Sequence, residues 1–207
     1  MFGVDATQQV HHDLWDITTV VLRKAIRQYV KAGDQVLELG TGQLAVLSIY
    51  CAKRRGARVL AVDISQRFLD NAADVARASG EPRIEFRWSD WFSKVADSKF
   101  DIIFANMPYI PTAMGEQAGA MSEHRQMWDG GEDGCDPVRI VLRDAPLHLA
   151  PQGRLLLGMN TMYVPRSQTL SLIRAAPGLQ FETIVRLPFC PSEVYVASSS
   201  HGRPTPQ

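Results

Sequence analysis

Short apolar segments with strand character alternate along this chain with longer segments that are apolar at helical spacing. This alternation predicts βαβ units, in which a parallel sheet is covered by helices on both faces. The expected strands are 35–39, 58–63, 83–87, 100–105, 154–159, 181–187 and 194–197, and the expected helices are 16–30, 44–55, 65–78, 136–149 and 166–176. The last two strands have no helix between them, which predicts one antiparallel strand. The expected fold class is therefore α/β, a Rossmann-like, mostly parallel sheet of seven strands with helices on both faces.

Composition and charge exclude several classes of protein. The 207 residues are enough for one domain with a sizeable core, and no apolar run approaches the roughly 18 residues that span a bilayer, so no membrane partner is expected. Lysine plus arginine and aspartate plus glutamate both number 22. The resulting formal charge of zero argues against nucleic acid as a partner, because duplex-binding proteins carry a basic excess. The spacing of Cys51, Cys135 and Cys190 fits neither a disulfide framework nor a metal site, which predicts reduced thiols, no bound metal and a cytoplasmic location.

A glycine turn follows the first expected strand and opens the next helix. Gly40, Thr41 and Gly42 form this turn. Glycine lets the backbone turn tightly and approach a ligand, and the helix N-terminus presents free amides. Asp63 ends the second expected strand, where its carboxylate can accept hydrogen bonds from both ribose hydroxyls of a nucleoside. The pattern predicts a nucleoside-containing cofactor.

Two cofactors fit this turn. With an alanine in the third glycine position and Asp63 about 20 residues further on, the spacing matches the dinucleotide fingerprint, so a nicotinamide-dependent oxidoreductase is an alternative. Glu38 favours S-adenosylmethionine instead, because a pyrophosphate would repel its carboxylate whereas a sulfonium and an amino group would attract it. Asp90 ends the third strand region and can accept a hydrogen bond from an adenine amino group. Ile64 and Trp91, which follow Asp63 and Asp90, are further cofactor-binding candidates.

A second motif, Asn106-Met107-Pro108-Tyr109, follows the expected strand 100–105. The carboxyl end of such a strand faces the ligand crevice of an open parallel sheet. The Asn106 side-chain oxygen and the Met107 carbonyl can grip the N–H groups of a planar nitrogen, orient its lone pair and stabilise the growing positive charge. Pro108 favours an extended Met107, and Tyr109 can stack on a planar group. With the glycine turn, this motif predicts methyl transfer to nitrogen.

The chain resembles the class I S-adenosylmethionine-dependent methyltransferases in four successive motifs, Glu38 to Gly42, Asp63, Asp90 and Asn106 to Tyr109. More narrowly, it resembles the HemK/PrmC group, which methylates a glutamine side-chain amide in peptide release factors. The stretch from Trp128 to Gly134 is similar to that group's sequence after its acceptor motif. The resemblance implies a seven-stranded sheet with one antiparallel strand.

Two departures from the group are visible. The usual second half of the glycine turn is replaced by Gln43-Leu44-Ala45, and Met107 stands in place of a proline. Because the expected contact at Met107 is a backbone carbonyl, the substitution leaves the proposed chemistry intact. Bacterial release-factor enzymes of the group carry an extra N-terminal helical domain, whereas about 34 residues precede the first strand here. A small-molecule acceptor therefore stands beside a protein glutamine.

The expected organisation has three parts. Residues 1–34 form a leading helical segment over the cofactor site, 35–198 form the methyltransferase domain and 199–207 form a disordered tail. The resemblance places Asp16, Thr18 and Thr19 where the leading helix closes over the cofactor. Pro111 to Cys135 is expected to be one long irregular stretch of functional importance. A non-catalytic adaptor that has kept the fold is a further alternative, and the oligomeric state is not predicted.

Overall fold

The computed structural model describes residues 17–81, 83–118 and 125–200. Within these ranges, seven strands form one sheet in the order β3-β2-β1-β4-β5-β7-β6. The strands are β1 (Gln35–Leu39), β2 (Arg58–Asp63), β3 (Ile84–Trp88), β4 (Phe100–Asn106), β5 (Leu149–Asn160), β6 (Leu179–Arg186) and β7 (Ser192–Ser199). Strand β7 runs antiparallel to both of its neighbours, whereas the pairs among β1 to β5 are parallel. The predicted fold class, with one antiparallel strand, is confirmed.

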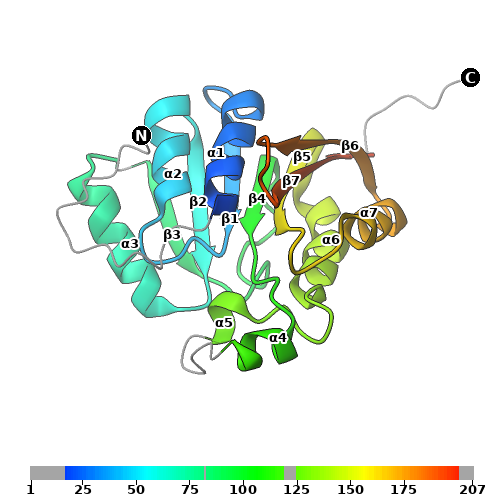
Figure 1. Cartoon of the computed structure of the whole chain (residues 1–207). Coiled ribbons are helices and arrows are strands. Elements are labelled where there is room, and N and C mark those ends of the chain that lie inside the picture. The colour runs from blue at the N-terminus through cyan, green and yellow to red at the C-terminus, as the bar shows by residue number, and fades with distance from the viewer. Residues whose placement is uncertain (1–16, 82, 119–124, 201–207) are drawn as a thin grey trace, which may run out of the picture.

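Helices cover both faces of this sheet (Figure 1). They are α1 (Ile17–Tyr29), α2 (Val46–Tyr50), the π-helical turn η2 (Cys51–Arg55), α3 (Gln66–Ala78), α4 (Thr112–Gln117), α5 (Arg125–Trp128), α6 (Asp136–His148) and α7 (Arg166–Ala175). Along β1, Val36 packs in the core under α1, α2 and α3, whereas Leu37 and Leu39 pack in the opposite core under α6 and α7. Alternate side chains of a strand point to opposite faces, so β1 anchors both cores.

Four details differ from the sequence predictions. The expected helix 44–55 begins only at Val46, because Ala45 adopts a left-handed backbone with φ of 46°, and its last turn is the π-helical η2. The Asp136-Pro137 pair predicts Asp136 as the N-cap of this helix, but the cap is Cys135 and Asp136 lies inside α6, where its carboxylate pairs with Arg139 at 3.0 Å. Strand β5 begins at Leu149 rather than Arg154, because Leu149 already pairs with Phe100 across a bulge. The stretch 111–135, expected to be irregular, contains α4 and α5.

Several local predictions are confirmed. The serine that opens the expected helix 65–78 is predicted as its N-cap, and Ser65 does cap α3, since its side chain accepts a hydrogen bond from the Phe68 amide. Strands β6 and β7 pair as a hairpin, as expected. Strand β7 extends to Ser199, and residues 201–207 of the expected tail lie outside the described residues, as do residues 1–16 of the leading segment. Among the described helices, none has the length and apolarity needed to cross a membrane.

Candidate functional site

The two sequence motifs meet at the carboxyl edge of the sheet. Leu39 of β1 pairs with Val62 of β2 on one side and with Ala105 of β4 on the other. The residues that follow these three, Gly40, Asp63 and Asn106, therefore lie in one row across three adjacent strands. Neighbouring strands are about 4.8 Å apart, so the glycine turn lies between the acidic residue and the acceptor motif. The expectation that these motifs converge on one ligand crevice agrees with this register.

Backbone geometry opens the glycine turn toward solvent. Gly40 and Gly42 both have positive φ, 71° and 63°, which glycine adopts without steric conflict. The amides of Gly40 and Thr41 both donate to the carbonyl of Val62, at 2.9 and 3.0 Å, which ties the turn to β2. A Cβ placed on either glycine would meet no atom within 4 Å. The space over the turn is therefore open, as a cofactor that approaches the backbone requires.

Asp63 connects the end of β2 to the glycine turn. Its Oδ2 accepts a hydrogen bond from the Gly42 amide, and its Oδ1 accepts one from the Ser65 amide, each at 2.9 Å. The residue is only 8% exposed, so these two bonds fix the orientation of its carboxylate. A carboxylate oxygen can accept more than one hydrogen bond. Asp63 is thus held in place by backbone amides while it keeps acceptor capacity for ribose hydroxyls.

Glu38 is buried, and hydrogen bonds from the glycine turn and from α2 hold its Oε2. The Thr41 hydroxyl donates to its Oε2 at 2.9 Å, and the Ser48 amide and hydroxyl donate to the same oxygen. Burial raises the pKa of the Glu38 carboxyl from its ordinary 4.5 to about 7, while the hydrogen bonds from Ser48 and Thr41 lower it and the nearby Asp63 carboxylate raises it further. In this arrangement Glu38 ties the glycine turn to the first residues of α2.

The ends of β2 and β3 form the outer part of the cofactor side. Asp63 pairs with Trp88, and the Trp88 indole N–H donates to the Ile64 carbonyl at 2.7 Å. Ile64 and Trp88 are 49% and 42% exposed, which leaves apolar surface beside the exposed Asp90. Trp91 is half-buried with a left-handed φ of 48°. Sequence reasoning did not select Trp88, although an aromatic residue so close to Asp90 is the signal that could have found it.

Asn106 has one satisfied and one unsatisfied side-chain atom. Its Nδ2 donates to the Thr19 hydroxyl oxygen at 3.2 Å. Its Oδ1 is buried and has no hydrogen-bond partner among the described residues. A buried carbonyl oxygen without a donor costs about 1–3 kcal/mol, and such groups are rare in native proteins. A ligand N–H that arrives at the end of β4 would supply the missing donor.

The other residues of the acceptor motif are more buried than a ligand-stacking role suggests. Met107 is 3% exposed and Tyr109 is 6% exposed. The Tyr109 ring packs against Tyr163, with centroids 5.9 Å apart and planes tilted by 31°, and its hydroxyl is 2.9 Å from the Thr18 hydroxyl. Pro108 is half-buried. Tyr109 therefore supports one wall of the site from within the core.

Helix α1 contacts the acceptor motif through Thr18 and Thr19. The resemblance implied that Thr18 and Thr19 close over the cofactor, but their described hydrogen bonds reach Tyr109, Ser192 and Asn106. Gly158 of β5 makes this approach possible, because a Cβ there would lie 2.8 Å from the Thr18 methyl carbon. Asp16, named with these threonines, lies outside the described residues.

The stretch after the acceptor motif folds back on it. Ile110 forms a bridge with Asp129, and α4 and α5 lie below the end of β4 in the view of Figure 1. Asp129 accepts hydrogen bonds from the Thr112 hydroxyl at 2.6 Å, from Arg125 at 2.5 Å and from the Gly131 amide at 3.0 Å. Burial raises the pKa of Asp129, but these hydrogen bonds outweigh it and hold the pKa below its ordinary value. The described part of this stretch is thus an ordered wall of the site.

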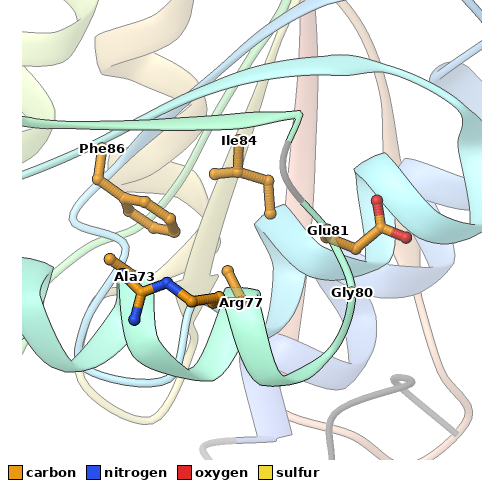
Figure 2. A pocket seen from close by; sticks show the side chains of 7 residues that line it. Ala73, Arg77, Gly80, Glu81, Ile84 and Phe86 are labelled. Atoms are coloured by element: carbon orange, nitrogen blue, oxygen red, sulfur yellow. The ribbon is translucent and has the colours of Figure 1, made fainter.

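A groove among the described residues lies away from this edge of the sheet (Figure 2). It encloses about 320 Å³ between the end of α3 and the beginning of β3, and is lined by Ala73, Ala76, Arg77, Gly80, Glu81, Ile84 and Phe86. The start of β3 is at the opposite edge of the sheet from the glycine turn, so this groove includes none of the predicted site residues. In the described ranges, no three histidine, cysteine, aspartate or glutamate side chains are grouped so that they could hold a metal ion.

Comparison with known proteins identifies the family. Residues 8–122, more than half of the chain, match the family model of the methyltransferase small domain. The chain therefore belongs to the methyltransferase small domain family, and the predicted resemblance to methyltransferases is confirmed. The nicotinamide-dependent alternative has no such support.

Three curated relatives are between 34% and 40% identical to this chain over the segments that align. A release factor glutamine methyltransferase of Cereibacter sphaeroides is 39% identical over 129 residues, which cover 59% of this chain and 45% of that protein. One of Xylella fastidiosa is 34% identical over 143 residues, covering 68% of this chain and 52% of that protein. A ribosomal protein uL3 glutamine methyltransferase of Bradyrhizobium diazoefficiens is 40% identical over 131 residues, covering 60% and 40%. The chain thus spans about half the length of the curated relatives it matches.

Solved structures show the same fold. A methyltransferase from Pyrococcus furiosus superposes on this chain with a TM-score of 0.67 at 19% sequence identity. The superposition covers 98% of this chain and 91% of that protein's chain. The Thermus thermophilus 16S rRNA N2 G1207 methyltransferase, in complex with AdoMet and guanosine, superposes with a TM-score of 0.64 at 19% identity, covering 95% and 45%. At this identity the likeness concerns the fold alone.

Proposed function

We propose that this protein is an S-adenosylmethionine-dependent N-methyltransferase whose acceptor is the side-chain amide of a protein glutamine. The observation that carries the proposal is the buried, unpartnered Oδ1 of Asn106, one strand away from the open glycine turn. The curated relatives that modify glutamine in release factors and in ribosomal protein uL3 support the same acceptor class. A primary amide offers the N–H donors that Oδ1 lacks.

The cofactor side of the site fits S-adenosylmethionine. The open space over Gly40 and Gly42 admits a ligand against the backbone, and the fixed carboxylate of Asp63 has acceptor capacity for ribose hydroxyls. Ile64 and Trp88 offer apolar surface for an adenine ring beside the Asp90 carboxylate. Thr41 and Trp91 are the remaining residues of the predicted cofactor site. The Thr41 hydroxyl donates a hydrogen bond to Glu38, which holds the glycine turn in place. Bound S-adenosylmethionine supplies a methyl group on a cationic sulfonium, which is already activated toward a nucleophile.

The chain's own contribution to the reaction is orientation and charge stabilisation. An amide lone pair is delocalised, so the nitrogen must be turned until its lone pair faces the methyl carbon. Asn106 Oδ1 and the Met107 carbonyl would accept the two N–H bonds and stabilise positive charge as the N–C bond forms and the S–C bond breaks. We assign no general base, because the methylated nitrogen is cationic and its proton is acidic enough to leave to water. Pro108 and Tyr109 would hold this geometry.

The proposal extends to the organisation of the protein. Residues 1–34 would form a leading segment over the cofactor site, and the methyltransferase domain would run from residue 35 to the end of β7 at Ser199. Acceptors from the translation apparatus would place the reaction in the cytoplasm. Nucleic acid is not proposed as a methyl acceptor.

This function is tested by incubating the protein with methyl-labelled S-adenosylmethionine and measuring transfer of label to a peptide. Two peptides are compared, which differ only in having glutamine or asparagine at one position. We expect label in the glutamine peptide alone, and an Asn106→Ala variant should lose about 100-fold in turnover while its affinity for S-adenosylmethionine stays unchanged. Labelling of extract fractions then separates the acceptor classes. Label confined to small molecules would overturn the protein acceptor, and turnover in Asn106→Ala equal to that of the native protein would overturn the assigned role of Asn106.

A further inference from the structure

The orientation of the Asn106 side chain is set by a residue far away in the sequence. An asparagine amide is nearly symmetric in shape, and a half rotation exchanges its oxygen with its NH₂ group. Only one of the two orientations presents a hydrogen-bond acceptor to an incoming N–H. The described contact that distinguishes them is the one between Asn106 Nδ2 and the Thr19 hydroxyl oxygen at 3.2 Å.

Helix α1 holds Thr19 at a fixed place. Thr18, the preceding residue, lies 2.8 Å from the Ser192 hydroxyl and 2.9 Å from the Tyr109 hydroxyl, oxygen to oxygen, and is fully buried. Thr19 itself is 6% exposed. The close packing of α1 over Gly158 leaves the helix little freedom to shift. The Thr19 oxygen is therefore presented to Asn106 by a rigid element and not by a loop.

A hydroxyl oxygen has two lone pairs, so the Thr19 hydroxyl can accept the N–H of Asn106 Nδ2. The opposite orientation of Asn106 would leave an NH₂ group with two N–H donors in the place where Oδ1 now lies. An incoming amide N–H would then meet a donor instead of an acceptor.

We infer that Thr19 is a positioning residue for methyl transfer: its hydroxyl accepts from Asn106 Nδ2 and so directs Asn106 Oδ1 at the acceptor nitrogen. This inference rests on the proposed function, because it assigns Thr19 an effect that acts through Asn106. Thr19 need not touch either substrate. It follows that the effect of removing the Thr19 hydroxyl depends on the presence of the Asn106 amide.

A double-mutant cycle with the glutamine peptide tests this dependence. Thr19→Val keeps the shape of the side chain and removes the hydroxyl, and we expect kcat to fall about 5- to 10-fold, as for loss of one hydrogen bond, with unchanged affinity for S-adenosylmethionine. Thr19→Ser, which keeps a hydroxyl, should restore most of the rate. In the Asn106→Ala background, Thr19→Val should change kcat less than about twofold. Thr183→Val, an exposed exchange of the same type on β6, serves as the matched control.

The outcomes separate the two proposals. If the native protein does not label the glutamine peptide, the proposed function fails. If it does, but Asn106→Ala leaves turnover intact, the assigned role of Asn106 fails and the positioning role of Thr19 fails with it. If Asn106→Ala reduces turnover but Thr19→Val causes the same loss with or without the Asn106 amide, the function stands and the positioning role of Thr19 is overturned. Failure of Thr19→Ser to recover the rate would also overturn it.

Nuclear magnetic resonance gives a readout that does not depend on activity. The side-chain amide signals of Asn106, assigned by their loss in Asn106→Ala, report the hydrogen bond from Nδ2 directly. We expect one of the two amide protons to move upfield in Thr19→Val and to stay near its original position in Thr19→Ser. Identical Asn106 amide signals in the native protein and in Thr19→Val would refute the contact on which the inference depends.

Discussion

Replacing Glu38 by glutamine separates two properties of this buried side chain, its hydrogen-bond acceptor and its charge. The described hydrogen bonds from Thr41 and Ser48 all end on Oε2, so the glutamine side-chain oxygen can take over that place. The pKa of Glu38 is about 7 in the folded protein against an ordinary 4.5. As the pH rises, the unfolded chain therefore loses this proton first, and the native protein loses stability between pH 4.5 and pH 7.

The magnitude follows from the gap between these two values. At about 1.4 kcal/mol for each tenfold change in proton affinity, the gap from 4.5 to about 7 corresponds to roughly 3 kcal/mol. Glutamine has no proton to lose, so the variant avoids this loss. The free energy of unfolding of Glu38→Gln, relative to that of the native protein, should therefore rise by about 2–3 kcal/mol between roughly pH 5 and pH 8.

Urea unfolding followed by circular dichroism measures this difference at several pH values in that range. Because the two proteins are compared at each pH, the contributions of all other titrating groups cancel. The sign is specific: Glu38→Gln gains relative stability toward high pH, whereas removal of a carboxylate that stabilises the fold as an ion would have the opposite effect. If the difference in unfolding free energy between Glu38→Gln and the native protein stayed constant with pH, the raised pKa of Glu38 would be refuted.

Three further predictions follow from local geometry. Asp63→Ala should weaken S-adenosylmethionine binding by roughly 1–3 kcal/mol in calorimetry, through loss of the acceptor for the ribose and of the anchor for the Gly42 amide; an unchanged affinity would remove Asp63 from the site. Gly134→Ala should destabilise the protein by about 2–4 kcal/mol in urea unfolding, because its φ is +74° and a Cβ would lie 2.5 Å from the Tyr109 carbonyl oxygen. Gly80→Ala, with a φ of +73° and no atom within 4 Å, is the matched control and should lose only about 1–2 kcal/mol. Phe189→Gly should increase the free energy of unfolding by roughly 0.5–1 kcal/mol and so raise the melting temperature, because it relieves a φ of 55° at a fully exposed side chain. A lower melting temperature would contradict this.

The parts of the fold that sequence reasoning predicted depend on local patterns. Apolar periodicity located the strands, and parallel pairing then required the residues after β1, β2 and β4 to meet at one edge, which is where Gly40, Asp63 and Asn106 lie. The predictions that failed depend on contacts between distant segments or on a single backbone angle. Helix α2 begins later than expected because Ala45 adopts a left-handed backbone conformation, which the alanine side chain gives no reason to predict.

The contacts around Asn106 could not be predicted for the same reason. The bond to Thr19 joins positions 87 residues apart, and neither residue type indicates a partner by itself. Likewise, the bridge between Ile110 and Asp129 joins two positions that are separated in the sequence by α4 and α5, and neither position lies in an expected strand. Sequence reasoning therefore located the row of site residues but not the side chains that hold them.

The contact between Thr18 and Ser192 has a consequence for how the protein is made. It joins positions 174 residues apart, from the first described helix to the last described strand. The cofactor side, from the glycine turn to Trp91, is encoded before β4, so its residues leave the ribosome early in synthesis. The acceptor side becomes complete only when β7 has emerged and paired with β5. During translation, Thr18 must therefore wait for nearly the whole chain before its partner Ser192 is available.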